Sequence, residues 1–150
     1  MNINLHFRKA QLGDLPRIIE LLKEDELGSK RETQNFENYQ KAFALIDADA
    51  NQFLLVIENE EEIIATSHLT KMPSLTFGGA LRLQIEAVRV AEKYRGQKIG
   101  QQMMAWIIDF AKKEKVKIIQ LTTNKKREKA KHFYENLGFE VTHEGMKLYL

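Results

Sequence analysis

The segment Tyr94-Arg95-Gly96-Gln97-Lys98-Ile99-Gly100 decides the expected fold, because a strand pattern precedes it and a helix pattern follows it. Residues 83–90 (LQIEAVRV) are typical of a strand, and residues 101–113 have the spacing of an amphipathic helix. A basic, glycine-containing turn that leads into a helix presents free N–H groups and the positive helix end to an anion. The segment therefore predicts a phosphate site.

The residue types of this turn suit an anion, although they also suit an ordinary solvated connection. Arg95 and Lys98 supply positive charge, and Gly96 and Gly100 let the backbone approach a bulky group. The chain contains neither G-x-x-x-x-G-K-[ST] nor G-x-G-x-x-G. A nucleotide-hydrolysing P-loop and a dinucleotide fold are therefore not supported.

The composition is that of an ordinary globular protein. The 150 residues suit a single domain spanning 1–150, with 43% hydrophobic and 29% charged residues. A net charge of +2 argues against a dedicated nucleic-acid binder. The absence of cysteine excludes disulfides, thiolate metal sites and a cysteine nucleophile. With no signal-peptide pattern and no long apolar run, we predict a cytoplasmic protein without membrane or metal partners.

The remaining patterns predict an α/β fold. Residues 4–10, 52–58, 63–71 and 116–123 are expected as strands, and 15–22, 39–46 and 128–137 as further helices. Residues 75–90 are expected to hold a further strand that is interrupted near Gly78-Gly79. Residues 25–38 are expected as a loop or a poorly packed helical turn, and residues 139–142 and 146–150 as a final hairpin. The prediction is a mixed sheet of about six or seven strands with about four helices.

A second motif lies in residues 130–139 (AKHFYENLGF). Ala130, Phe133, Tyr134 and Leu137 share one helical face, which by itself is also the pattern of a core helix. The motif follows the strand that comes after the phosphate-loop helix, so we expect it beside the same cleft.

Together the two motifs resemble the GNAT superfamily of acyl-CoA-dependent N-acetyltransferases, over essentially the whole chain. In the family pattern Arg/Gln-x-x-Gly-x-Gly/Ala, the fixed positions are taken by Arg95, Lys98 and Gly100. Lys98 replaces a glycine, so its backbone has either an ordinary negative φ or a strained positive one. Arg127 stands where many members have an asparagine, and Asn124 is the residue expected to take its place.

The resemblance implies acetyl-CoA as cosubstrate and a set of residues that hold it. Backbone groups of Val88 and Val90 would bind the pantetheine arm, the loop would bind the pyrophosphate, and Tyr134 would stand near the thioester sulfur. The implied cofactor-binding residues are Val88, Val90, Arg95, Gly96, Gln97, Lys98, Ile99, Gly100, Asn124 and Phe133. A phenol near the sulfur can donate a proton to the departing thiolate, so Tyr134 is the expected acid.

The attacking amine must be neutral, which calls for a base. Glu86 is the first candidate, because it shares a strand face with Val88 and a carboxylate on this strand often serves in the family. The alternative is a carboxylate paired with Arg82 or Arg89. His68 is the second candidate, although a lone strand histidine is more often structural. Attack is expected to be direct, since no cysteine is present to carry an acyl group.

These features predict acetylation of a primary amine on a small molecule. Residues 121–127, followed by His132-Phe133-Tyr134, also look similar to aminoalkylphosphonate N-acetyltransferases. Lys125, Lys126 and Arg127 would then suit an anionic amine, or equally the 3′-phosphate of CoA.

Four other possibilities remain open. The chain could acetylate a protein N-terminus or lysine, with residues 25–38 covering or forming a groove. It could be a non-catalytic acyl-CoA-binding module that needs neither Glu86 nor Tyr134. A weaker possibility is nucleic-acid binding by the basic run 125–131. Strand edges in the expected final hairpin would also permit a homodimer.

Overall fold

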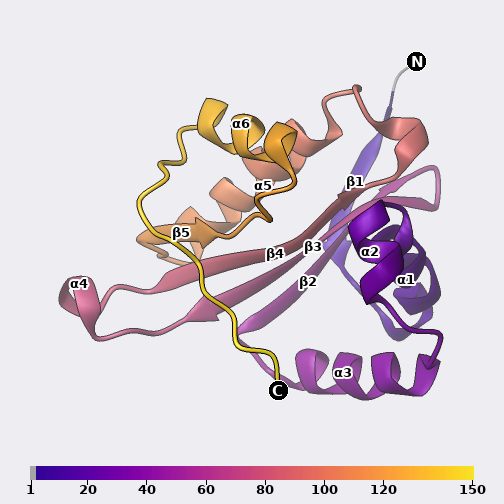
Figure 1. Cartoon of the computed structure of the whole chain (residues 1–150), viewed down its shortest axis with the longest axis horizontal. Helices are drawn as coiled ribbons and strands as arrows, with labels where there is room; N and C mark the ends of the chain where they lie inside the picture. Colours follow the sequence, from indigo (N-terminus) through magenta and orange to yellow (C-terminus); the bar gives the residue numbers. More distant parts are fainter. Residues whose placement is uncertain (1–2) are drawn as a thin grey trace. The chain divides into compact units, whose positions relative to one another are not determined.

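The computed structural model describes residues 3–150. They contain one five-stranded sheet, and within residues 3–120 helices lie on both of its faces (Figure 1). The strands are β1 (Leu5–Lys9), β2 (Gln52–Asn59), β3 (Glu62–Met72), β4 (Arg82–Val90) and β5 (Ile118–Leu121). The helices are α1 (Leu15–Lys23), α2 (Glu26–Arg31), α3 (Phe36–Ala48), α4 (Thr76–Gly79), α5 (Ile99–Lys113) and α6 (Glu128–Asn136), with 3-10 turns η1 (Leu12–Asp14) and η2 (Glu92–Tyr94). The chain divides into two compact units, residues 1–120 and 121–150.

The sheet order follows the chain, β1-β2-β3-β4-β5. The first four strands are antiparallel neighbours. β5 returns to β4 after α5. Lys117 N donates to Leu81 O, and the Gln120 side chain donates to that of Gln84, both at 2.9 Å. The sequence separation is 36 residues at both contacts, as in a parallel pair. The predicted mixed sheet is therefore confirmed.

The two faces of the sheet bury different helices because side chains alternate along each strand. On one face α5 buries Met103, Met104 and Ile107, and the rings of Phe7, Phe53, Trp106 and Phe110 are in contact, with centroids 5.0–5.8 Å apart. On the other face the helices of residues 15–48 pack a cluster that includes Leu15, Ile18, Leu21, Phe43, Leu54 and Val56. The second cluster covers only part of its face.

The segment predicted as a loop or weak turn contains the short helix α2. The Asp25 carboxylate caps it by accepting a hydrogen bond from Gly28 N at 2.6 Å. Gly28 is buried against the end of α1, and a Cβ at this residue would lie 1.8 Å from Leu22 O. Glycine is thus required by a close backbone approach. Of the other residues of α2, Glu26, Ser29, Lys30 and Arg31 are exposed, so the expectation of a poorly packed helical turn holds for them.

The expected numbers of strands and helices were wrong. Residues 3–150 contain five strands and six α-helices. Residues 139–150 form no strand, and the apolar side chains of residues 141–150 are exposed, including Val141, Met146 and Leu148. Alternation can predict that a strand is possible, but a strand forms only where a free sheet edge pairs with it. The extra helices are α2 and the single turn α4, which are too short to show helical periodicity.

Candidate functional site

Strand β4 carries a β-bulge next to the predicted base and pantetheine residues. Thr66 pairs with Arg89 and His68 pairs with Glu86, so two steps on β3 span three on β4. The extra residue is absorbed at Ala87, which has φ +52°. A bulge bends a strand and interrupts its ladder of hydrogen bonds. Val88 therefore follows a point where β4 departs from regular pairing, and an extended ligand arm can add to a strand there.

The turn after β4 has the glycine conformation that the sequence indicated and a strained lysine. Gly96 has φ +75°, and a Cβ at this residue would have nothing within 4 Å. Glycine is therefore favoured here by the backbone conformation, and a side chain would cause no steric clash. Lys98 takes up φ +64° and ψ +18° immediately before α5. A left-handed backbone costs a non-glycine residue roughly 1–2 kcal/mol. Of the two conformations considered for Lys98, the strained one is found.

The start of α5 is open to an acceptor. No side chain caps this helix, and its first backbone bond to the turn runs from Gln102 N to Lys98 O at 3.1 Å. Among residues 3–150, the N–H groups of Ile99, Gly100 and Gln101 consequently have no acceptor. Three such donors at the positive end of a 15-residue helix favour an oxyanion.

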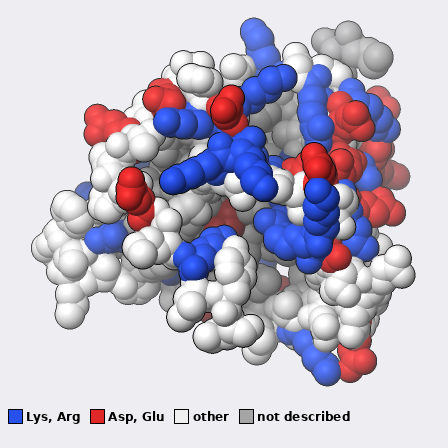
Figure 2. Space-filling view, viewed as in Figure 1, with Lys and Arg blue, Asp and Glu red and all other residues white. Residues whose placement is uncertain are grey.

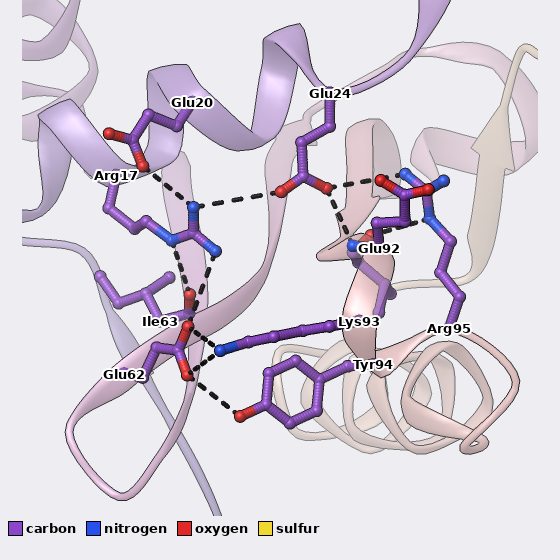
Figure 3. A network of polar contacts seen from close by, with 10 residues as sticks. Arg17, Glu20, Glu24, Glu62, Ile63, Glu92, Lys93, Tyr94 and Arg95 are labelled. Carbon is purple, nitrogen blue, oxygen red and sulfur yellow. Dashed lines mark hydrogen bonds and ion pairs between the residues drawn. The ribbon is translucent and has the colours of Figure 1, made fainter.

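A polar network from α1 and the β2–β3 turn holds this loop in place (Figure 3). Glu24 accepts a hydrogen bond from Glu92 N at 3.0 Å and lies 3.7 Å from Arg95 Nη2. Arg95 Nε donates to Val90 O at 3.1 Å. The guanidinium of Arg95 thus ties the loop to β4 and to Glu24 at the end of α1.

The same network continues to the turn between β2 and β3. Glu62 accepts hydrogen bonds from Lys93 Nζ at 2.9 Å and from Tyr94 OH at 3.0 Å. Lys93 is the main reason why the pKa of Glu62 lies below its ordinary value. Arg17 of α1 donates to Ile63 O at 3.1 Å and to Glu20 at 2.9 Å. Figure 2 shows mixed basic and acidic side chains where Figure 1 places α1 and α2, in agreement with these pairs.

A row of polar side chains crosses β2, β3 and β4 on one sheet face. Glu86 lies opposite His68, and His68 Nε2 contacts Gln52 Oε1 at 2.5 Å. Thr70 Oγ1 donates to the same oxygen at 3.1 Å. The neighbouring Gln84 accepts from Gln120 of β5. The row lies on the face of Leu54 and Val56, beyond the helices that cover those two residues.

The two candidate bases differ in their surroundings. Burial lowers the pKa of His68, and the nearby charge of Glu86 opposes this shift. Because Gln52 Oε1 accepts, a neutral His68 carries its proton on Nε2 and offers Nδ1 as the basic atom. Glu86 is exposed, and its carboxylate forms no ion pair within the described chain. The suggested pairing of Glu86 with Arg82 is not found, since Arg82 contacts Thr76 and Gln120.

The unit of residues 121–150 holds the other predicted residues. The Tyr134 ring is half-buried between Phe133 and Phe139, with centroids 5.2 and 5.7 Å away. Gly138 has φ +97° and ends α6, which confirms it as the glycine after the helix. Asn124 Oδ1 accepts a hydrogen bond from Lys126 N at 2.9 Å, so this amide shapes the turn before α6.

Sequence reasoning named His68 but missed the bulge at Ala87 and the other polar side chains of the row, Gln52, Thr70 and Gln84. No sequence signal marks the bulge, since alanine has no preference for positive φ. The polar row had a signal in the alternation of Arg82, Gln84 and Glu86 with Leu83 and Ile85. Within residues 3–150, no group of three or more His, Asp or Glu residues is placed to hold a metal ion. None of the described helices has the length and apolar character of a membrane span.

The chain is similar to known proteins in both sequence and structure. Residues 15–139 match the family model described as "Acetyltransferase (GNAT) family". Over 60 residues the chain is 37% identical to an aminoalkylphosphonate N-acetyltransferase from Salmonella typhimurium; this match covers 40% of the chain and 39% of that enzyme.

Solved structures with the same fold extend over almost the full chain. A protein described as a transcriptional regulator from Bacillus halodurans C-125 has a TM-score of 0.93 and 41% identity, with coverage of 98% of this chain and 100% of its own. A putative acetyltransferase from Agrobacterium tumefaciens str. C58 has a TM-score of 0.85 and 25% identity, with coverage of 97% and 99%. The family match runs through both compact units.

Proposed function

Because the chain belongs to the GNAT family of acetyltransferases, which use acetyl-CoA, we propose that it transfers the acetyl group directly to a primary amine of a small molecule. One observation carries the proposal: the bulged strand β4 leads through the Gly96 turn into the uncapped start of α5. A pantetheine arm needs an interrupted strand, and a pyrophosphate needs free N–H donors.

The residues proposed to hold acetyl-CoA are Val88 and Val90 on β4, the loop from Arg95 to Gly100, and Asn124 with Phe133. Acetyl-CoA supplies the acetyl group as a thioester. In the loop we assign anion binding to the backbone and assign Arg95 to bracing the turn. Lys98 adds a positive charge at the same place, which suits a pyrophosphate.

The proposed chemistry needs one base and one acid. Glu86 takes a proton from the substrate ammonium, and the freed lone pair forms the new C–N bond at the acetyl carbon as the C–S bond breaks. After the C–N bond forms, the nitrogen loses its second proton to the solvent and becomes a neutral amide. The thiolate receives a proton from Tyr134, the Tyr134 phenolate regains one from the solvent, and Glu86 releases its proton to the solvent. An exposed carboxylate without an ion pair can accept a proton without losing a structural contact.

The proposal is tested by calorimetry with acetyl-CoA and CoA, followed by thiol release over a panel of small amines. Binding of both cofactor forms, with turnover on at least one amine, is expected. Binding without turnover on any amine or peptide would favour the non-catalytic module. Turnover on peptides alone would favour protein acetylation. Because one solved relative is described as a transcriptional regulator, DNA binding at low and high salt completes the test.

Tyr134→Phe is expected to lower the rate of thiol release about 10- to 100-fold without weakening acetyl-CoA binding. The phenylalanine retains the ring contacts with Phe133 and Phe139 but has no proton to donate. Steady-state kinetics across pH, together with calorimetry, checks this result. Unchanged turnover at every pH would remove Tyr134 from the mechanism, and Tyr149→Phe at the exposed C-terminal segment is the matched control.

A homodimer is also proposed, on the evidence of the C-terminal segment. Residues 146–150 alternate as a strand would, yet they form none, and Met146, Leu148 and Tyr149 are exposed. A second copy of the chain would offer a sheet edge and cover these side chains.

A further inference from the structure

The guanidinium of Arg82 has only neutral neighbours. Its Nη1 donates to Gln120 Oε1 at 3.3 Å, its Nη2 donates to Thr76 Oγ1, and it lies over the Phe77 ring at 5.4 Å. Its Nε is buried and has no hydrogen-bond partner among the described residues. No ion pair involves Arg82 in residues 3–150. A permanently charged group therefore stands at the sheet without a carboxylate to balance it.

Arg82 stands at the end of the polar row that contains the proposed base. Arg82, Gln84 and Glu86 alternate on one face of β4, and their pairing with Met72, Thr70 and His68 is in unbroken register. Four residues of strand separate the Cα atoms of Arg82 and Glu86 by about 13 Å. Both side chains are long, so a short molecule can reach both charged groups. The row thus offers a cation at one end, a carboxylate at the other and an amide between them.

The connection before β4 holds Arg82 in position. Ser74 Oγ donates to Ala80 O at 2.7 Å and closes the turn that contains α4. Phe77 has φ +52°, a costly conformation for an aromatic residue, and its side chain is 77% exposed. This conformation places the Phe77 ring beside the guanidinium and leaves the ring exposed to solvent. A strained turn that orients one cation is typical of a binding site.

We propose that the acceptor is a zwitterion: its amine lies at Glu86, and its anionic group, a carboxylate, phosphate or phosphonate, is bound by Arg82. The inference rests on the proposed acetyl transfer. The forked guanidinium suits an anion with two or more oxygens, bound through its Nη groups because Nε is buried. The neutral neighbours of Arg82 leave its charge available, and Gln84 offers hydrogen bonds to the middle of the molecule.

The test compares amines that differ only in the anionic group. For each chain length, an aminoalkyl carboxylate, an aminoalkyl phosphate and an aminoalkyl phosphonate are assayed beside the plain alkylamine. The wild-type protein is expected to favour at least one anionic series by 10-fold or more in kcat/KM, and the best series identifies the anion. Arg82→Gln is expected to raise KM for that series about 10- to 100-fold, with little change for the alkylamine.

Two further variants keep the result interpretable. Lys41→Gln on α3 removes one positive charge from an exposed side chain. It is expected to change neither the KM for the anionic amines nor the KM for the alkylamine. Arg82→Lys keeps the charge but loses the fork, and an intermediate KM is expected. If Arg82→Gln does not fold, the preference of the wild type for anionic amines and the KM of Arg82→Lys still test the inference. Equal kcat/KM for anionic amines and plain alkylamines in the wild type would overturn the zwitterion inference but not the proposed acetyl transfer. An equal rise in KM for both kinds of amine in Arg82→Gln would do the same. Absence of turnover on every amine would overturn the proposed transfer as well.

Discussion

Replacement of Glu86 by glutamine is expected to reduce kcat/KM for the accepted amine by about 100-fold or more, with acetyl-CoA binding unchanged. The amide retains the size of the side chain but cannot take a proton from an ammonium group. The site of the change is exposed and forms no ion pair in residues 3–150, so the fold should be unaffected. Steady-state kinetics with calorimetric titration of acetyl-CoA measures both parts of this prediction.

His68→Gln is the control, because His68 is the other group able to serve as base. If His68 were the base, Glu86→Gln would retain most of its activity and His68→Gln would lose it. A smaller effect of His68→Gln is expected, through its contact with Gln52 and its place opposite Glu86. A Glu86→Gln variant with near wild-type turnover would contradict the assignment of the base.

The acid side of the pH profile separates catalysis from stability. Burial lowers the pKa of folded His68, so the unfolded chain binds a proton more readily, near its ordinary value of ~6.5. The contribution of neutral His68 to stability is complete above that pH and declines as pH falls below it. Loss of kcat without a lower Tm would report protonation of the catalytic base, whereas a lower Tm would report His68.

Substitution of Gly28 by alanine is expected to destabilise the protein by about 1–3 kcal/mol, with the upper part of that range favoured. The new Cβ would lie 1.8 Å from Leu22 O and 2.9 Å from Asp25 Oδ1. The nearer atom is backbone and cannot rotate away, so α2 must shift from the end of α1. That shift would also strain the Asp25 cap, whose bond to Gly28 N is 2.6 Å long.

Gly13→Ala provides the matched comparison for this prediction. A Cβ at Gly13 has nothing within 4 Å, and the residue lies outside the left-handed region. Its effect on the free energy of unfolding is expected within about 0.5 kcal/mol of zero. Urea unfolding of the two variants measures the difference directly. Equal stability of Gly28→Ala and Gly13→Ala would show that the α1–α2 contact relaxes without cost.

Features that depend on residues close together in the sequence were predictable from it. The strand, the Gly96 turn and helix α5 follow from hydrophobic period and glycine position, and Gly138 closes α6 as expected. The prediction of a C-terminal hairpin was wrong because pairing of a strand depends on residues that are distant in the chain. Its alternation is real, but no local pattern records whether a partner edge exists.

The sequence by itself determined the family, the acetyl-CoA cosubstrate and the order of strand, turn and helix, because short-range preferences and two motifs encode them. The tertiary structure alone decided the bulge at Ala87, the left-handed Lys98 and the alignment of Glu86 with His68. These features depend on strand register and on contacts between residues distant in the chain, and packing decides them against local preference. The uncompensated Arg82 belongs to the same group, since its neighbours come from β5 and the α4 turn.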